Sequence, residues 1–284
     1  MDYSVLMSVY HKENPDFLSA SIESILNQTV KTNDFVIVCD GPLNEDLYRV
    51  IDDYCHRYPV LFHIIRLEKN MGLAHALNAG IGYCKNEIVA RMDSDDIALP
   101  DRMEKQLSVI EDRNVDIVGG TVREFRGSAK TVEEIESDSS CLGSARQLPQ
   151  EREEILSFAK KRSPFNHPSV MYKKSFVQKC GGYRNYEYFE DYNLWVSMLM
   201  EGAEAYNLRD ILVYMRAGDE MYKRRGGLSY VGKIVRFKTH LKKIGFISTG
   251  QMIVGVGGHI AVGIMPNSLR TFVYKKLLRK NGDS

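Results

Sequence analysis

The chain has 284 residues, 44% of them hydrophobic, which is enough for one large α/β domain or two small ones. Lys plus Arg (38) nearly balance Asp plus Glu (37), and the net charge of +1 gives no argument for nucleic acid as a partner. The seven His and five Cys show neither zinc-site spacing nor a CxxC, which favours small buried thiols in a reducing compartment. Neither a leader sequence nor a run of ~18 apolar residues is evident, so we expect a cytoplasmic protein.

The first half of the chain alternates predicted strands with predicted helices. Continuous apolar and β-favouring residues predict strands at 3–10, 35–39, 60–66, 87–92 and 115–122. Helical spacing and capping signals predict helices after Asn14-Pro15, over 45–57 and 72–84, and after Pro100. This alternation predicts a largely parallel sheet covered on both faces, with ligands bound beyond the carboxyl ends of its strands.

The second half is less regular. Residues 126–150 are rich in Ser, Gly and Glu and lack periodicity, which predicts a mobile loop. The loop would serve either as a lid over a bound ligand or as a passive insertion. Beyond it we expect a helix at about 150–161, strands at 167–172 and 211–215, and a helix from about Asp191.

Three acids, Asp93, Asp95 and Asp96, directly follow the strand predicted at 87–92. Carboxylates this close repel one another unless a cation neutralises them, and Mg²⁺ and Mn²⁺ prefer oxygen ligands. In the alternative interpretation, Asp96 or Asp101 caps the next helix and the other acids are solvated. Spacing alone leaves both interpretations open.

Other polar residues also have two interpretations. Asp40, at the end of the second strand, is either a turn residue or a ligand. Residues 70–80 place a helix N-terminus at the same edge, where it suits a phosphate, although packing explains its small residues equally well. Glu190 and Asp191 either favour a helix N-terminus or supply a general base. His167 is most simply a loop residue bonded to backbone.

Taken in order, these segments resemble an inverting, family 2 glycosyltransferase of the GT-A fold. The resemblance covers about residues 3–215 and rests on SVLMSVYHKEN, VIVCDGP, NMGLAHALNAG, RMDSDD, LPDRM, NHPSVMY, GGY and FEDYNLW. It implies transfer of a hexose or N-acetylhexosamine from a nucleotide sugar, with UDP favoured, to a saccharide hydroxyl in surface-polysaccharide assembly. It also divides the chain into a GT-A catalytic domain (1–215) and a basic amphipathic helical extension (216–284).

The resemblance assigns a nucleotide-sugar site to Ser8, Val9, Tyr10, Asp40, Gly72 and Asp93. The first three match the stretch that cradles base and ribose, and Asp40 matches the acid that hydrogen-bonds the base. Asp93 would face the ribose or first phosphate, and Asp95 would ligate Mn²⁺ or Mg²⁺. Gly72 stands where some relatives carry an Arg, so phosphate contact there would use backbone N–H groups or a basic residue from elsewhere.

The resemblance places the acceptor side later in the chain. Asp191 matches the general base that deprotonates the acceptor hydroxyl, and Glu190 matches a neighbour that helps to hold the acceptor. His167 falls in a segment that lines the acceptor side. A lipid-diphosphate-linked saccharide is the expected acceptor.

The C-terminal 70 residues are basic and amphipathic, notably over 222–245 and 268–280. Such segments bind anionic bilayer surfaces, so we expect peripheral attachment at the inner face of the cell membrane. Arg224 and Arg225 would meet the diphosphate of the acceptor. In the alternative, the tail packs against the catalytic domain and its basic face is solvated.

Two other functions compete with transfer. A sugar-nucleotide nucleotidyltransferase usually has a glycine- and Arg/Lys-rich phosphate loop after its first strand, and SVYHKENP has no such glycine run. A non-catalytic nucleotide-sugar-binding domain would have lost Asp95 or Asp191, and both are present. The sequence leaves the sugar, the acceptor and the linkage open.

Overall fold

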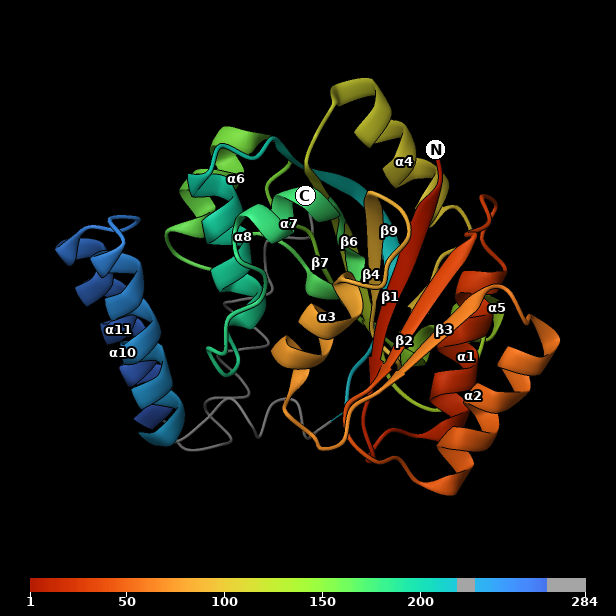
Figure 1. Cartoon of the computed structure of the whole chain (residues 1–284). Coiled ribbons are helices and arrows are strands. Elements are labelled where there is room, and N and C mark those ends of the chain that lie inside the picture. The colour runs from red at the N-terminus through yellow and green to blue at the C-terminus, as the bar shows by residue number, and fades with distance from the viewer. Residues whose placement is uncertain (219–227, 265–284) are drawn as a thin grey trace.

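The computed structural model of the protein describes residues 1–218 and 228–264. Its nine-stranded sheet has the order β3-β2-β1-β4-β8-β6-β9-β5, with β7 paired to β6 (Figure 1). The strands are β1 (Tyr3–Val9), β2 (Asp34–Cys39), β3 (Phe62–Arg66), β4 (Ile88–Met92), β5 (Ile97–Ala98), β6 (Ile117–Phe125), β7 (Leu142–Arg146), β8 (Met171–Lys173) and β9 (Ala205–Arg216). The helices are α1 (Pro15–Leu26), α2 (Glu45–Arg57), α3 (Leu73–Ile81), α4 (Arg102–Arg113), α5 (Val132–Ser137), α6 (Arg152–Ala159), α7 (Lys174–Lys179), α8 (Glu190–Met200), α10 (Leu228–Lys243) and α11 (Thr249–Ile264), with 3₁₀ turns η1 (Ser139–Cys141) and η2 (His167–Ser169).

The sheet is parallel in one half and mixed in the other. Strands β3, β2, β1 and β4 are parallel neighbours, as the alternation of strands and helices predicted. Beyond them, β8 is antiparallel to both β4 and β6. This change of direction leaves β3, β2, β1 and β4 as the part of the sheet whose carboxyl ends share one edge.

Two hydrophobic cores lie on opposite faces of the sheet. Along β1, Leu6 packs with α3 and α8 on one face, whereas Val5 and Met7 pack with α1, α2 and α4 on the other. This follows from the two-residue period of a strand, whose successive side chains point to opposite faces. Burial on both faces explains why the strand reads as a continuous apolar run.

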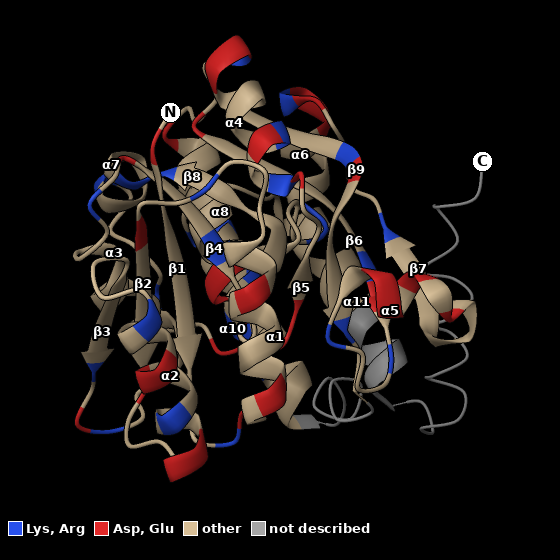
Figure 2. Ribbon diagram, turned by 90° about the vertical axis from the view of Figure 1, so that its right-hand side faces the viewer, with Lys and Arg blue, Asp and Glu red and all other residues tan. Residues whose placement is uncertain are grey.

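The predicted helix starts are confirmed at α1 and α2. The Asn14 side chain accepts a hydrogen bond from the N–H of Asp16 at 2.8 Å, and Pro15 is the first helical residue. Asn44 caps α2 in the same way through the N–H of Leu47. Acidic and basic residues follow one another in groups along the ribbon of α2 (Figure 2).

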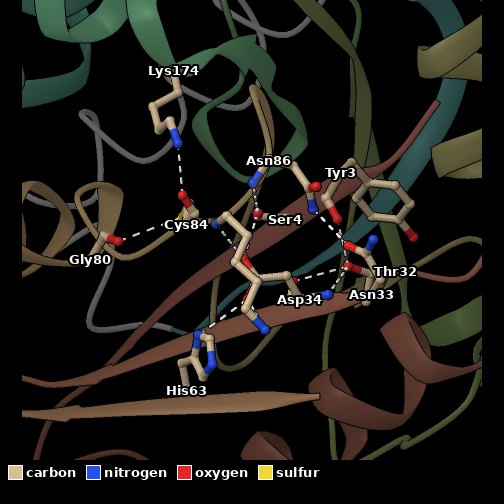
Figure 3. Close-up of polar contacts among 11 residues, drawn as sticks. Tyr3, Ser4, Thr32, Asn33, Asp34, His63, Gly80, Cys84, Asn86 and Lys174 are labelled. Atoms are coloured by element: carbon tan, nitrogen blue, oxygen red, sulfur yellow. Dashed lines mark hydrogen bonds and ion pairs between the residues drawn. The ribbon is translucent and has the colours of Figure 1, made fainter. Parts of the chain in front are cut away.

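A buried acid joins the strands at the end of the sheet opposite the predicted site (Figure 3). Asp34 accepts hydrogen bonds from the hydroxyl of Ser4 at 2.6 Å and from the N–H of Lys85 at 2.8 Å. Its other oxygen lies 3.2 Å from Nδ1 of His63 on β3. These contacts fix the relative register of β1, β2 and β3, on which the alignment of their carboxyl ends depends.

The expectation of an unstructured loop at 126–150 is wrong. Residues within this range form α5, η1 and β7, and β7 pairs antiparallel with β6. Ile135 on α5 is fully buried against Phe125 and Tyr214. The polar composition hid the element because β7 gains its order from backbone pairing with β6 rather than from apolar side chains. A lid role for this segment stays a proposal.

Helices α10 and α11 run side by side next to α8 (Figure 1). Ile234, Phe237 and Leu241 of α10 are buried against the domain, which agrees for these residues with the alternative in which the tail packs on it. Among the residues described, no helix has the length and apolar character needed to cross a bilayer. Arg224, Arg225 and segment 268–280 lie outside the described residues, and the domain boundary at 215 stays a prediction.

A buried lysine also attaches α10. The ammonium group of Lys238 donates to the carbonyl oxygens of Lys160 at 3.4 Å and Lys161 at 3.1 Å, just beyond α6. It lies 3.3 Å from the hydroxyl of Tyr192 on α8. Burial lowers the pKa of Lys238 to about 8, so the group is still largely charged at neutral pH. Lys238 therefore links three helices.

Candidate active site

The predicted donor residues meet at the carboxyl ends of β1, β2 and β4. β1 lies between β2 and β4 and is parallel to both. One step beyond β2, Asp40 lies beside Tyr10, and its N–H donates to the carbonyl of Val9 at 2.8 Å. One step beyond β4, Asp93 lies beside Ser8. Strand register alone thus brings together residues from three separate segments.

Three carboxylates form a candidate metal centre after β4. Asp93, Asp95 and Asp96 each offer an oxygen, and these oxygens lie within 4.8 Å of one another. Burial, with the charges of Asp93 and Glu13 adding, raises the pKa of Asp95 to about 7. Burial and the charge of Asp95 likewise raise the pKa of Asp96. Within the described residues, Oδ2 of Asp96 is buried without a hydrogen-bond partner, so the donor set fits a hard divalent cation.

The turn that carries these acids is fixed from several sides. At the end of β9, the N–H of Arg216 donates to Asp96 at 2.8 Å and its Nε donates to the carbonyl of Asp95 at 2.9 Å. The Arg216 guanidinium lies 3.8 Å from the ring centre of Phe17. The hydroxyl of Ser94 donates to Glu13, in the loop after β1. The acids are therefore held in place by backbone and side-chain contacts.

The helix-cap interpretation of these acids is not supported. Asp101 occupies the N-cap position of α4 but makes no side-chain cap hydrogen bond. Its carboxylate instead pairs with Lys105 at 2.8 Å. Asp96 bonds to Arg216, outside α4. The cluster therefore owes its position to β4 and β9 rather than to the start of α4.

A buried arginine lies next to the first aspartate. The side chain of Arg91, on β4, is 2% exposed and forms an ion pair with Asp93. Burial opposes the charge of Arg91, but the Asp93 carboxylate outweighs it and raises the pKa of Arg91. The two residues share a face of the strand because they are two positions apart. Arg91 therefore places a buried positive charge directly beside the first acid of the cluster.

The carboxylate of Asp40 is hydrogen-bonded to the loop before α3. One of its oxygens accepts the N–H of Met71 at 2.8 Å and the other accepts the N–H of Gly72 at 3.0 Å. Gly72 has φ = 88°, a left-handed conformation that glycine adopts without strain. These two N–H groups therefore bind Asp40, and only the remaining lone pairs of the carboxylate are available for the predicted contact with a base.

The acceptor-side residues gather around Tyr183. Nε2 of His167 lies 3.1 Å from the Tyr183 hydroxyl, so this residue contacts a side chain rather than the backbone. Burial, with the charge of Arg91 adding, lowers the pKa of His167 well below its usual value, which leaves the ring neutral at pH 7. Burial raises the pKa of Tyr183, and the charges of Asp191 and Asp93 add to it. Residues assigned to the donor side and to the acceptor side therefore both act on this phenol.

Glu190 and Asp191 begin α8, as the sequence predicted. Burial raises the pKa of Glu190 to about 7, and the charges of Asp191 and Glu187 add to the effect. Just before them, Tyr188 has φ = 73°, which costs a non-glycine residue about 1–3 kcal/mol. The chain therefore enters α8 through a strained turn.

Four residues that the sequence analysis did not single out contribute to the site: Glu13, Arg91, Tyr183 and Arg216. Arg91 carried a signal, because a single charge inside the apolar run 88–92 requires a buried partner. Arg216 carried none, since its contacts with Asp95 and Asp96 join segments about 120 residues apart.

Comparison with solved structures identifies the class of fold. TarS from S. aureus in complex with UDP-GlcNAc superimposes with a TM-score of 0.60 and 14% identity, over 98% of this chain and 72% of that one. The mannosyltransferase PcManGT from Pyrobaculum calidifontis, in complex with GDP-Man and Mn²⁺, superimposes with a TM-score of 0.57 and 14% identity, over 94% of this chain and 71% of that one. At these identities the likeness shows the fold alone, which is that of the GT-A glycosyltransferases.

Sequence comparison gives the family. The model described as Glycosyl transferase family 2 matches residues 4–181, and the chain belongs to this family. A relative from Escherichia coli, named UDP-Gal:alpha-D-GlcNAc-diphosphoundecaprenol beta-1,3-galactosyltransferase, is 37% identical over 98% of this chain and 97% of its own. The amylovoran biosynthesis glycosyltransferase AmsE of Erwinia amylovora is also 37% identical, over 96% of this chain and 98% of its own.

The raised pKa of Glu190 predicts a pH-dependent effect of Glu190→Gln. Between pH ~4.3 and about 7 the folded state binds more protons than the unfolded one, so this group makes the protein less stable as pH rises. Glu190→Gln removes this loss of stability because the amide does not ionise. Partial exposure screens the charge, so we expect a gain of about 1 kcal/mol, or ~2–4 °C in Tm, at pH 8 and none at pH 4. Thermal unfolding across pH measures this; a difference that does not change with pH contradicts it.

Proposed function

We propose that the protein transfers a hexose or N-acetylhexosamine, galactose first among them, from a UDP sugar to a saccharide carried on a lipid diphosphate. The main support is one observation: Asp93, a member of the oxygen-ligand cluster, and Asp191, a carboxylate suited to general base catalysis, both act through their charges on the same buried phenol, Tyr183. The relative named for UDP-Gal and a GlcNAc-diphosphoundecaprenol acceptor matches nearly the whole chain, which supports this choice of substrates.

The donor half of the site would bind the nucleotide diphosphate. Ser8 and Tyr10 would line the edge where base and ribose lie, between Asp40 and Asp93, whereas Val9 is fully buried in the core beside them. Asp95, with Asp93 and Asp96 beside it, would hold Mn²⁺ or Mg²⁺. A bound cation of this kind offsets the charge that develops on a leaving diphosphate.

The acceptor half would supply the base. In the proposed step the acceptor oxygen forms a bond to the anomeric carbon as the bond from that carbon to the UDP oxygen breaks. Asp191 takes the hydroxyl proton, a contribution of typically ~10²–10⁴-fold to rate. Attack from the face opposite the leaving group inverts the anomeric configuration, so no covalent intermediate is needed. Glu190 and neutral His167 would bind acceptor hydroxyls.

We also propose peripheral contact with an anionic membrane through α11 and the exposed side of α10. Ile253 and Val254 of α11 are 62% and 76% exposed, although they are apolar. Arg236, Lys242 and Lys243 of α10 are exposed as well. Exposed apolar side chains with cations on an adjacent helix are what an anionic bilayer surface binds. Such contact would place the site near a lipid-linked acceptor at the inner face of the membrane.

Asp191→Asn should abolish transfer while the fold is kept. The amide has the same size but accepts no proton at neutral pH, so kcat should fall by ~10²–10⁴-fold. Galactose transfer from UDP-galactose to a GlcNAc-diphosphate lipid analogue measures this, and circular dichroism checks the fold. Asp210→Asn, at an exposed position on β9, is the control and should keep full activity. Wild-type rates in Asp191→Asn would remove this residue as the base.

Asp95→Ala should weaken metal binding. Loss of one oxygen ligand should raise the Mn²⁺ concentration for half-maximal binding by at least ~10-fold. Calorimetric titration of Mn²⁺ into protein with UDP measures this without any turnover. Asp101→Ala lies only six residues away and removes a carboxylate that pairs with Lys105, so it should bind Mn²⁺ normally. Equal affinities in both variants would contradict the assignment of the cluster.

The paired substitution Ile253→Glu and Val254→Glu should release the protein from anionic vesicles. Two added acids oppose both apolar insertion and attraction to the lipid charge. Flotation with phosphatidylglycerol-containing liposomes at low salt measures the bound fraction. Val60→Glu changes an equally exposed apolar residue in the turn between α2 and β3, and should leave flotation unchanged. Failure of the wild-type protein to float would end the membrane proposal.

A further inference from the structure

The segment that leads into α8, residues 186–190, packs against α10 through aromatic side chains. Phe189 stacks on Phe237 of α10, with ring centres 4.8 Å apart and planes inclined by 3°. Tyr186 stacks on His240 of the same helix at 4.7 Å. Because Asp191 directly follows this segment, the position of its carboxylate depends on a helix from the far end of the chain.

One charged side chain of α10 contacts the middle of this segment. The ammonium group of Lys233 forms an ion pair with Glu187 and lies 4.7 Å from the ring centre of Tyr188. The hydrogen bond that Lys233 donates to Glu187 raises the pKa of Lys233, and the charges of Glu187 and Glu190 add to the effect. Lys233 thus acts on the residues immediately before Asp191.

The backbone at this point needs such support. Tyr188 is in the left-handed region, with φ = 73°, where a side chain is strained and persists only if its surroundings hold it. Its ring lies edge-on to Tyr230 of α10, 5.6 Å away, in addition to its contact with Lys233. The strained turn is therefore held by residues of one helix.

We propose that Lys233 is a positioning residue for transfer: through Glu187 and Tyr188 it fixes the turn that orients Asp191 toward the acceptor hydroxyl. The inference rests on the proposed function, since only there is Asp191 the base. It gives α10 a role in turnover that is separate from any contact with a membrane.

An ordinary surface ion pair would have no such effect, and the chain offers a matched example. Lys179 lies 3.2 Å from Glu201 and 5.3 Å from the ring centre of Phe176, so it also combines an ion pair with an aromatic contact. Glu201 directly follows α8, at the end opposite Glu190. Exposed pairs of this kind contribute little to stability. Lys179→Met therefore removes the same chemistry at a place that does not support the turn.

The test compares Lys233→Met, Lys233→Arg and Lys179→Met with the wild-type full chain. Steady-state transfer from UDP-galactose to a GlcNAc-diphosphate carrying a short alkyl chain, without vesicles, separates catalysis from membrane binding. Hydrogen–deuterium exchange of peptides covering 184–191 reports the turn directly. Peptides from β1 and β4 report whether the sheet stays folded.

We expect Lys233→Met to lower kcat roughly tenfold, with an unchanged KM for UDP-galactose, because a displaced base misaligns the attack without affecting donor binding. Exchange over 184–191 should increase while the sheet is unaffected, and Lys233→Arg should restore most of both. Lys179→Met should match the wild type.

Unchanged kcat and exchange in Lys233→Met would overturn the proposal, as would an equal loss in Lys179→Met or faster exchange throughout the sheet. A wild-type protein that transfers no sugar would instead refute the proposed function. The exchange comparison then decides by itself whether Lys233 fixes the turn.

Discussion

The mutual repulsion of three carboxylates on one turn is the constraint on which the candidate site depends. The negative charge of Asp93 is offset by an ion pair with Arg91, which lies beside it on β4. Asp95 and Asp96 receive support mainly through Arg216. Burial and the neighbouring acids nevertheless raise the pKa of both, so ionising all three acids together is unfavourable in the protein alone. A divalent cation would favour the ionised forms by neutralising their charge.

The two halves of the site are held by different means. The donor half depends on strand register, because a one-residue slip of β1 would turn Ser8 and Tyr10 to the opposite face. The contacts of Asp34 with Ser4 and His63 fix that register from the far end of the strands. The acceptor half depends on side-chain packing between α8 and α10. It can therefore change through substitutions that leave the sheet intact.

This difference explains what the sequence could predict. The strands of the parallel half, the helix starts at Asn14 and Asn44, and the rim positions of Asp40 and Asp93 follow from local periodicity and capping, and the structure has them. The strand within residues 126–150 depends on pairing with β6, which the composition of the segment does not reveal. The contacts of Arg216 join residues distant in sequence, and no local pattern reports such a pair.

The C-terminal helices show a related limit of sequence patterns. An amphipathic segment indicates an apolar surface to be covered, but protein and bilayer are both apolar partners. In α10 the apolar face, including Phe237 and Leu241, is covered by the domain. Any attraction to lipid within the described residues then depends on α11 and on the exposed cations of α10. Because α10 also contacts the segment before Asp191, a helix that approached a lipid-linked acceptor would be the same helix that positions the proposed base. Substrate approach and base position would then be linked through one rigid element.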